Sequence, residues 1–198
     1  MSESESESAP LSADAADDSP SFDLPTDSDF KKAFVAWLGG LGGEARELSA
    51  LLAREDATPS LRRFAAETLN QLLYAVDLIP EGIEGLGFLE ALFGFRLRAR
   101  ELSEAEPDSL SADPHGTVRR LAREAGLVRS FLGEEDERRL LALVSAQSEK
   151  RARGRSVVDL LEVPEAQSAA IADVQSWAER YRPSQFGTGS HDLVRLLS

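Results

Sequence analysis

The chain has 198 residues, a formal net charge of −13 and no cysteine. The lack of cysteine excludes disulfides, thiolate metal ligands and a cysteine nucleophile, and it favours a reducing, cytoplasmic compartment. The acidic total argues against nucleic-acid binding, because a polyanion repels phosphates. Hydrophobic residues make up 42% of the chain and aromatic residues only 7%. This balance allows a packed core and favours an all-α fold.

The N-terminal end differs in composition from the rest of the chain. Residues 1–29 contain nine acidic residues and no basic one, which leaves 26 acids against 22 bases, a net charge of −4, in the remainder. The first residues offer too little apolar surface to offset the entropy cost of ordering them. We therefore predict a disordered acidic tail over residues 1–28, a helical domain over 29–182 and a flexible tail over 183–198. The longest uncharged stretch, 33–43, has 11 residues and is too short to cross a bilayer.

Two expected helices flank a glycine-rich stretch. Apolar residues recur at helical spacing in residues 29–38 (Phe30, Phe34, Trp37, Leu38) and in residues 44–55 (Ala45, Leu48, Leu51, Leu52). Glycine weakens a helix, so the stretch 39–43 predicts a hinge or a helix stop. No apolar strand precedes this stretch and no Gly-Lys-Ser/Thr motif follows it, which argues against a phosphate-binding loop.

The next two helices are expected to form an apolar hairpin. Thr58 can cap the first of them, and Pro59 suits the first helical position. A stripe of apolar or small residues then continues for four turns: Leu61, Phe64, Ala65, Thr68, Leu69, Leu72, Leu73 and Val76. A proline at position 80 favours a turn there, so a helix that begins near Ile83 or Gly85 should fold back on the stripe.

The C-terminal half predicts four further helices, over residues 117–132, 134–152, 157–162 and 164–181. Ser156 and Asp159 have the spacing of a capping box before the third of these, and Pro164 suits the start of the last. The chain therefore predicts an all-α domain of about seven or eight helices.

A short pattern at the turn of the hairpin carries a family resemblance. Tyr74 precedes the run Asp77-Leu78-Ile79-Pro80, and Leu86-Gly87-Phe88-Leu89 follows it. These residues resemble the signature of the YkvA-like family of small bacterial helical domains, whose biochemical activity is not established. The resemblance covers about residues 44–100 and implies a helical hairpin with no activity attached. The chain departs from the family pattern at Ala75, Glu81, Glu84 and Glu90-Ala91.

Asp77 allows two interpretations, because it directly follows an apolar stripe where an unpaired carboxylate would be costly. In the structural one, its oxygens accept backbone N–H groups of the turn or pair with an arginine. In the functional one, Asp77 joins Glu81 and Glu90 around a hard cation or in acid–base catalysis. The two histidines, His115 and His191, have no nucleophile motif beside them. We expect no enzyme activity and no cofactor, and the acidic site remains an alternative.

Two basic clusters, over residues 96–100 and 150–155, allow contact with anionic lipid headgroups or with an acidic partner. The alternative is that they are salt-bridged helix ends. The predicted function is that of a non-catalytic interaction protein with an unidentified protein partner, and a peripheral role at the membrane surface is one form of it. A further alternative is a docking peptide that follows a linker near the C-terminal end, with apolar anchors Leu193, Val194, Leu196 and Leu197. Such a peptide would bind either its own domain or another protein.

Overall fold

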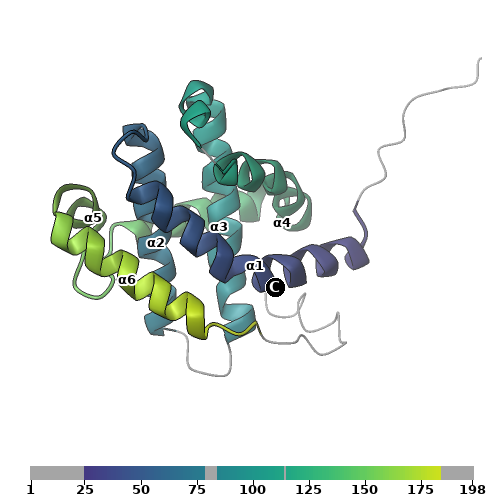
Figure 1. Cartoon of the computed structure of the whole chain (residues 1–198). Helices are drawn as coiled ribbons and strands as arrows, with labels where there is room; N and C mark the ends of the chain where they lie inside the picture. Colours follow the sequence, from purple (N-terminus) through teal and green to yellow (C-terminus); the bar gives the residue numbers. More distant parts are fainter. Residues whose placement is uncertain (1–24, 79–83, 114, 184–198) are drawn as a thin grey trace, which may run out of the picture.

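A computed structural model describes residues 25–78, 84–113 and 115–183 (Figure 1). These residues form α1 (Asp27–Leu52), α2 (Pro59–Leu78), α3 (Glu84–Ala105), the 3₁₀ helix η1 (Pro107–Ala112), α4 (Thr117–Ser148), α5 (Val157–Glu162) and α6 (Pro164–Arg180). No β-strand occurs in this described part, where Ala152 and Arg155 form an isolated bridge. The prediction of an all-α domain is confirmed.

The predicted tails lie almost wholly outside the described residues, and only the start of the first helix is placed. α1 begins two residues before the expected position, because the sequence supplies an N-terminal cap there. The Thr26 N–H group donates to Asp29 Oδ2 at 3.0 Å, and the Thr26 hydroxyl donates to the same oxygen at 2.7 Å. Acidic residues in the first turn also favour the helix through its dipole.

Helix α1 continues without a break through the glycine-rich stretch, so the predicted hinge at residues 39–43 is wrong. Leu41, in the middle of the stretch, is fully buried. Gly42 faces α6, where an added Cβ atom would lie 3.4 Å from the carbonyl oxygen of Ala178. Burial of the apolar residue and close helix packing outweigh the low helix propensity of glycine, which costs about 1 kcal/mol per residue relative to alanine.

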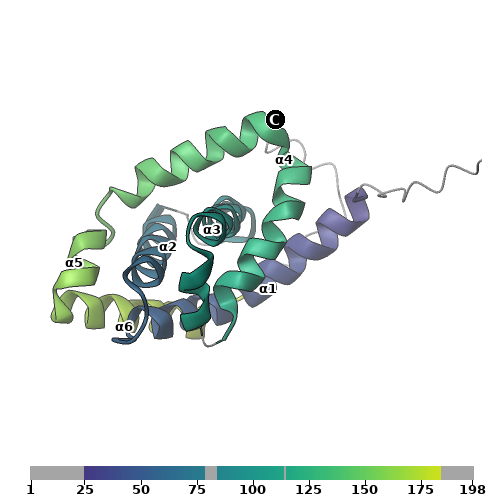
Figure 2. The same cartoon turned by 90° about the horizontal axis from the view of Figure 1, so that it is seen from above.

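Helices α2 and α3 form the predicted antiparallel hairpin, and they occupy the centre of the domain. The Leu61 N–H group donates to Thr58 Oγ1 at 3.3 Å, as expected for the cap of α2. The apolar stripe of α2 is buried from Leu61 to Leu73, and Val76 is half-buried. Figure 2 shows the two helices nearly end-on, with α1, α4, α5 and α6 around them. The other helices of the domain therefore cover the apolar faces of the hairpin.

Helix α4 wraps around the hairpin because it bends. The backbone at Gly133 is not helical (φ 75°, ψ 171°), and this kink confirms the predicted boundary between residues 132 and 134. Beyond the kink α4 lies against α3 at Gly94, where a Cβ atom would be 2.8 Å from Val144 Cγ2. Only a residue without a side chain permits this approach. Figure 2 shows the bend as a change of direction along the upper edge of the domain.

Polar caps fix the starts of the C-terminal helices. The carboxylate of Asp113 accepts from the N–H groups of Thr117 at 3.2 Å and Val118 at 2.9 Å, so it satisfies two free donors of α4. The capping box before α5 forms as predicted: Ser156 N–H donates to Asp159 Oδ2 at 2.8 Å, and Ser156 Oγ accepts from the Asp159 N–H group. The sequence analysis missed both η1 and the role of Asp113.

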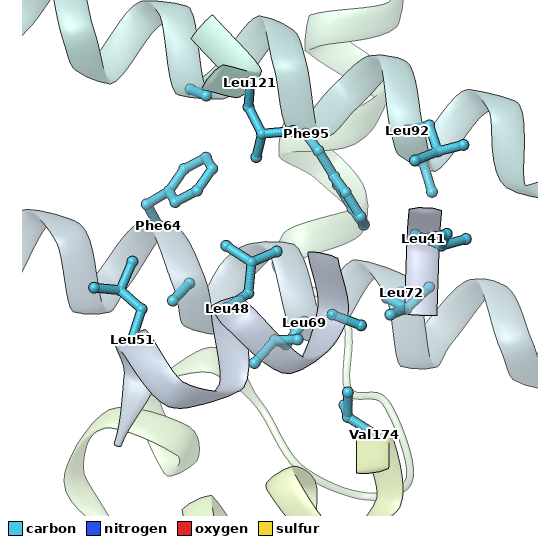
Figure 3. Packing of buried hydrophobic residues seen from close by; sticks show 14 of the residues in the cluster. Leu41, Leu48, Leu51, Phe64, Leu69, Leu72, Leu92, Phe95, Leu121 and Val174 are labelled. Carbon is cyan, nitrogen blue, oxygen red and sulfur yellow. The ribbon is translucent and has the colours of Figure 1, made fainter. Parts of the chain in front are cut away.

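The core is one continuous cluster between the hairpin and the surrounding helices. It takes side chains from α1, α2, α3, α4, α5 and α6, so no helix buries its apolar face alone. Figure 3 shows part of this packing, with the labelled residues Leu41, Leu48, Leu51, Phe64, Leu69, Leu72, Leu92, Phe95, Leu121 and Val174.

Candidate functional site

Three arginines on α3 connect this central helix to three of its neighbours. They occupy every second position, so on a helix Arg96 and Arg100 lie on one face and Arg98 points to the opposite side. We call Arg96, Arg98 and Arg100 the α3 arginine ladder. In order, their inter-helix partners are Glu44 of α1, Glu67 of α2 and Glu137 of α4. The first predicted basic cluster is therefore paired within the domain.

Arg96 is the most buried member of the ladder, with 0% of its side chain exposed. Its Nη2 atom lies 2.9 Å from Glu44 Oε1 and 2.7 Å from Glu124 Oε2, and Nη1 donates to the Leu92 carbonyl at 3.1 Å. The guanidinium carbon also lies 3.9 Å from the ring centroid of Trp37. A buried guanidinium is stable only with such partners, so these contacts hold α1, α3 and α4 in one arrangement.

Arg120 of α4 extends the group of ion pairs around Arg96, Glu44 and Glu124 toward the surface, and we call this group the Arg96 cluster. Its Nη1 atom lies 2.8 Å from Glu44 Oε1, and Nη2 lies 3.1 Å from Glu47 Oε2. The Thr117 hydroxyl donates to the same Glu47 oxygen at 2.8 Å. Every carboxylate of the cluster therefore has a cationic partner, and Glu44 and Glu124 each contact both Arg96 and Arg120.

The chemistry of this cluster is that of a clamp rather than a catalyst. Burial lowers the pKa of Arg96, while the charges of Glu44 and Glu124 oppose that shift. Burial also acts to lower the pKa of Arg120, but its bonds to Glu44 and the nearby carboxylates raise it overall. An arginine held between carboxylates stays protonated and cannot act as a general base. The cluster therefore stabilises the helix arrangement.

The predicted acidic site is only partly described. Asp77 lies at the end of α2 and pairs with Arg153, at 3.2 Å between Oδ1 and Nε, which agrees with the arginine form of the structural interpretation. Glu90 accepts a hydrogen bond from Gln147 Nε2 at 2.9 Å. Glu81 lies outside the described residues. Within residues 25–78, 84–113 and 115–183, no group of three His, Asp or Glu side chains could hold a metal ion.

The family-motif residues lie around the α2–α3 connection. Tyr74 is half-buried on α2, where its hydroxyl accepts from Lys150 Nζ at 3.2 Å. Phe88 and Leu89 are buried in α3. The side chains of Leu78, Leu86 and Gly87, together with Ile79 and Pro80, lie outside what the structure describes.

The second basic cluster is also largely paired. Arg151 contacts Asp159, Arg153 contacts Asp77 and Asp173, and Arg155 contacts Asp173. None of the described helices is long and apolar enough to cross a membrane. The positive charges that suggested an anionic membrane surface are therefore mostly balanced by carboxylates of the same domain.

A hollow of about 590 Å³ lies between the N-terminal end of α2 and helix α5. We call it the α2–α5 hollow. Ala57, Pro59 and Leu161 supply apolar lining, and Glu55, Arg62 and Arg63 supply charge. Val158, three residues before Leu161 in the sequence, and Val163, two residues after it, are exposed apolar residues, with exposed fractions of 56% and 41%.

Two charged groups of the α2–α5 hollow lack partners. Arg63 pairs with Glu67, at 3.0 Å between Nε and Oε1. By contrast, the Arg62 side chain has no hydrogen bond or ion pair within the described part of the chain, and its Nε atom is shielded from solvent. Glu55 is exposed and likewise has no ion pair among those residues. The hollow thus presents one unpaired cation and one unpaired anion beside an apolar wall.

A smaller hollow, of about 280 Å³, shares Ser60 and Arg63 with the first. Its two arginines, Arg63 and Arg98, both contact Glu67. Burial raises the pKa of Glu101, which also lines it, while the charges of Arg98 and Arg100 oppose that shift. Because its cations already share an internal carboxylate, this hollow offers less to a ligand than the α2–α5 hollow.

The remaining predicted residues give no further site. His115 is exposed in the turn before α4, and His191 and the predicted anchors Leu193, Val194, Leu196 and Leu197 lie outside the described residues. Sequence reasoning missed the α2–α5 hollow, because it joins the residues around position 60 to a helix 100 residues later. Comparison of the chain with protein-family models, curated proteins and solved structures finds no match.

Proposed function

We propose that this protein is a non-catalytic interaction protein that binds an extended or helical segment of a partner protein at the α2–α5 hollow. The observation that carries the proposal is the unpaired Arg62 side chain beside the apolar lining of the hollow. Because the Arg62 side chain lines the hollow without an ion pair among the described residues, a carboxylate of a partner could form a charge-assisted hydrogen bond with it there. Most other arginines in the domain already contact an internal carboxylate or carbonyl.

The pairing of charges favours a protein partner over a membrane. A membrane-surface protein needs basic side chains that are free to face anionic headgroups. Here Arg96 is buried, Arg98 and Arg100 pair with carboxylates of other helices, and the second basic cluster contacts Asp77, Asp159 and Asp173. The acidic site of Asp77, Glu81 and Glu90 remains an alternative function, as metal site or enzyme. A cytoplasmic location would suit the proposed role, since a chain without cysteine fits a reducing compartment.

The relationship to the YkvA-like family is also a proposal. It is supported by the position of the motif, which spans the connection of the central hairpin, and by the burial of Phe88 and Leu89. In that reading the motif residues maintain the hairpin, and the binding surface lies elsewhere on the domain.

A charge reversal at the hollow tests the function. In a pull-down from native lysate, we expect the Arg62→Glu variant to fail to retain proteins that the parent chain retains, because the cation of the hollow becomes an anion. The matched control is Arg123→Glu on α4, since the Arg123 side chain also has no ion pair or hydrogen bond among the described residues and lies outside the hollow. Equal retention by both variants, with unchanged thermal unfolding, would contradict the proposal.

A vesicle assay tests the membrane form separately. We expect no more co-sedimentation with vesicles that contain anionic lipid than with neutral ones, at low salt where charge attraction is strongest. Binding to anionic vesicles that weakens as salt rises would instead favour the membrane-surface role.

A further inference from the structure

We infer that the segment Asp192–Leu197 of the same chain occupies the α2–α5 hollow and thereby competes with a partner protein. The inference rests on the proposed function, which makes the hollow a binding surface. The segment has the sequence Asp-Leu-Val-Arg-Leu-Leu, so four apolar residues accompany one acid and one base.

The charges of the segment complement those that the hollow leaves unpaired. The hollow presents the cation of Arg62 and the anion of Glu55, both without an ion pair among the described residues. The segment presents Asp192 and Arg195, of opposite sign and three residues apart. Two opposite pairs fix the direction in which the segment would lie, whereas a single pair would not.

The apolar residues of the segment match the rest of the surface. Leu193, Val194, Leu196 and Leu197 would cover the apolar wall of the hollow, which Ala57, Pro59 and Leu161 form. Removal of apolar area from water favours association by about 25 cal/mol per Å². The linker keeps the local concentration of the segment high, so a weak interaction between the segment and the hollow is enough to hold it there.

The linker has the length that this placement requires. Leu161 of the hollow lies three residues before the start of α6, and the 17 residues of α6 lead the chain away from it. The return distance is therefore about the length of α6, or about 25 Å at 1.5 Å per residue. Residues 184–191 can span about 28 Å when extended. Figure 1 shows α5 and the start of α6 at the left of the domain, and the end of α6 below α1.

The acidic N-terminal segment fits the hollow less well. Residues 1–24 contain seven acids and no base, so they would leave the negative Glu55 opposed by like charge. They also contain few large apolar residues to cover the wall.

A nitroxide label on the full chain tests the placement directly. The protein has no cysteine, so Ser198→Cys gives a single labelled position. We expect the label to broaden the amide resonances of Ser60 and Leu161, which line the hollow, and to spare those of Phe30 near the start of α1. Broadening spread evenly over the domain, or absent from Ser60 and Leu161, would overturn the inference.

Charge reversals show whether the contact is the proposed one. Arg62→Asp and Asp192→Arg should each remove the broadening at Ser60, and the double variant should restore it. Failure of the double variant to restore it would contradict the pairing of these two residues. A thermal unfolding midpoint equal to that of the parent excludes misfolding as the cause of a lost signal.

Two further samples separate the other occupants. A mixture of isotope-labelled parent chain with nitroxide-labelled, isotope-free chain reports contact between copies. Broadening in that mixture would assign the hollow to a second copy and overturn the inference.

A nitroxide label at Ser2→Cys that broadens the amide resonance of Ser60 would assign the hollow to the N-terminal segment and likewise overturn the inference. If the segment docks in cis, Asp192→Arg should also retain more partner than the parent. If Arg62→Glu loses a partner and Asp192→Arg retains as much of it as the parent does, the proposed function stands and this inference is rejected.

Discussion

Two parts of this molecule contain the same spacing of three arginines, and they use it differently. The α3 arginine ladder is Arg96-Leu97-Arg98-Ala99-Arg100, and the turn after α4 is Arg151-Ala152-Arg153-Gly154-Arg155. On α3 the arginines reach three neighbouring helices from the centre of the domain. In the turn, where Arg153 and Gly154 have positive φ values of 50° and 78°, the arginines pair with carboxylates near the surface.

Burial, and not the charge pattern, therefore sets how much an arginine contributes to stability, and Arg96 is the fully buried member of the six. A buried guanidinium and its carboxylate have lost their hydration, so the removal of one partner leaves the other in a costly state. A surface pair remains partly hydrated and screened by salt, so its removal costs little. Four substitutions test this contrast, and their expected effects decrease from Arg96 to Asp159.

The largest effect is expected at Arg96. Arg96→Met should lower the free energy of unfolding by about 3–5 kcal/mol, because it leaves Glu44 and Glu124 without their buried cation. The loss should lie toward the lower end, since Glu44 keeps its contact with Arg120. Urea unfolding measures it. A loss below about 1 kcal/mol, as is usual for a surface pair, would remove the distinction between the two arginine triplets.

The next effect concerns the packing that buries the ladder. Gly94→Ala should destabilise the domain by about 1–3 kcal/mol, because its methyl group would lie 2.8 Å from Val144 Cγ2 and 3.1 Å from Gln71 Nε2. The control is Gly126→Ala on α4, where nothing lies within 4 Å of the added atom. There the higher helix propensity of alanine should stabilise the protein by up to about 1 kcal/mol. Thermal unfolding of both variants decides whether α3 and α4 are packed this closely.

A smaller effect is expected in the turn. Arg153→Ala removes contacts to Asp77 and Asp173, whose side chains are 42% and 34% exposed, so its cost should be at most about 1 kcal/mol. Added salt should abolish the difference from the parent, because exposed pairs are screened. The cost of Arg96→Met should persist in the same salt. A loss of stability in Arg153→Ala that does not change with salt would show that the ion pairs of the turn stabilise the domain in the same way as those of the α3 arginine ladder.

The smallest effect is a change in acid stability at the partner of Arg151. Hydrogen bonds from the Ser156 N–H and hydroxyl groups lower the pKa of Asp159 in the folded protein, against a weaker opposing effect of desolvation. The stabilisation is therefore present above the ordinary pKa of an aspartate, about 3.9, and is lost as pH falls through the lowered folded value. Asp159→Asn should weaken the dependence of stability on pH in that window. Identical acid unfolding curves for parent and variant would contradict the prediction.

The sequence predicted the parts of the fold that depend on local patterns. The stripe of α2, the Thr58 cap and the capping box of Ser156 and Asp159 each need only residues within a few turns of one another. The boundary between the expected helices 117–132 and 134–152 was also predicted, and the kink at Gly133 lies there. The expected break at residues 39–43 was wrong, because Gly42 packs against α6 and Leu41 is buried in the core.

The sequence by itself therefore determined the all-α class, the central hairpin and the presence of two basic clusters. Tertiary structure alone decided what those clusters do, because Glu44 and Arg96 are 52 residues apart and Arg153 and Asp77 are 76 apart. It also decided that Arg62 and Glu55 remain unpaired beside Leu161, which places the candidate binding surface at the α2–α5 hollow. A periodic pattern records which face of a helix is buried, but the partner of a charge depends on which helix packs beside it.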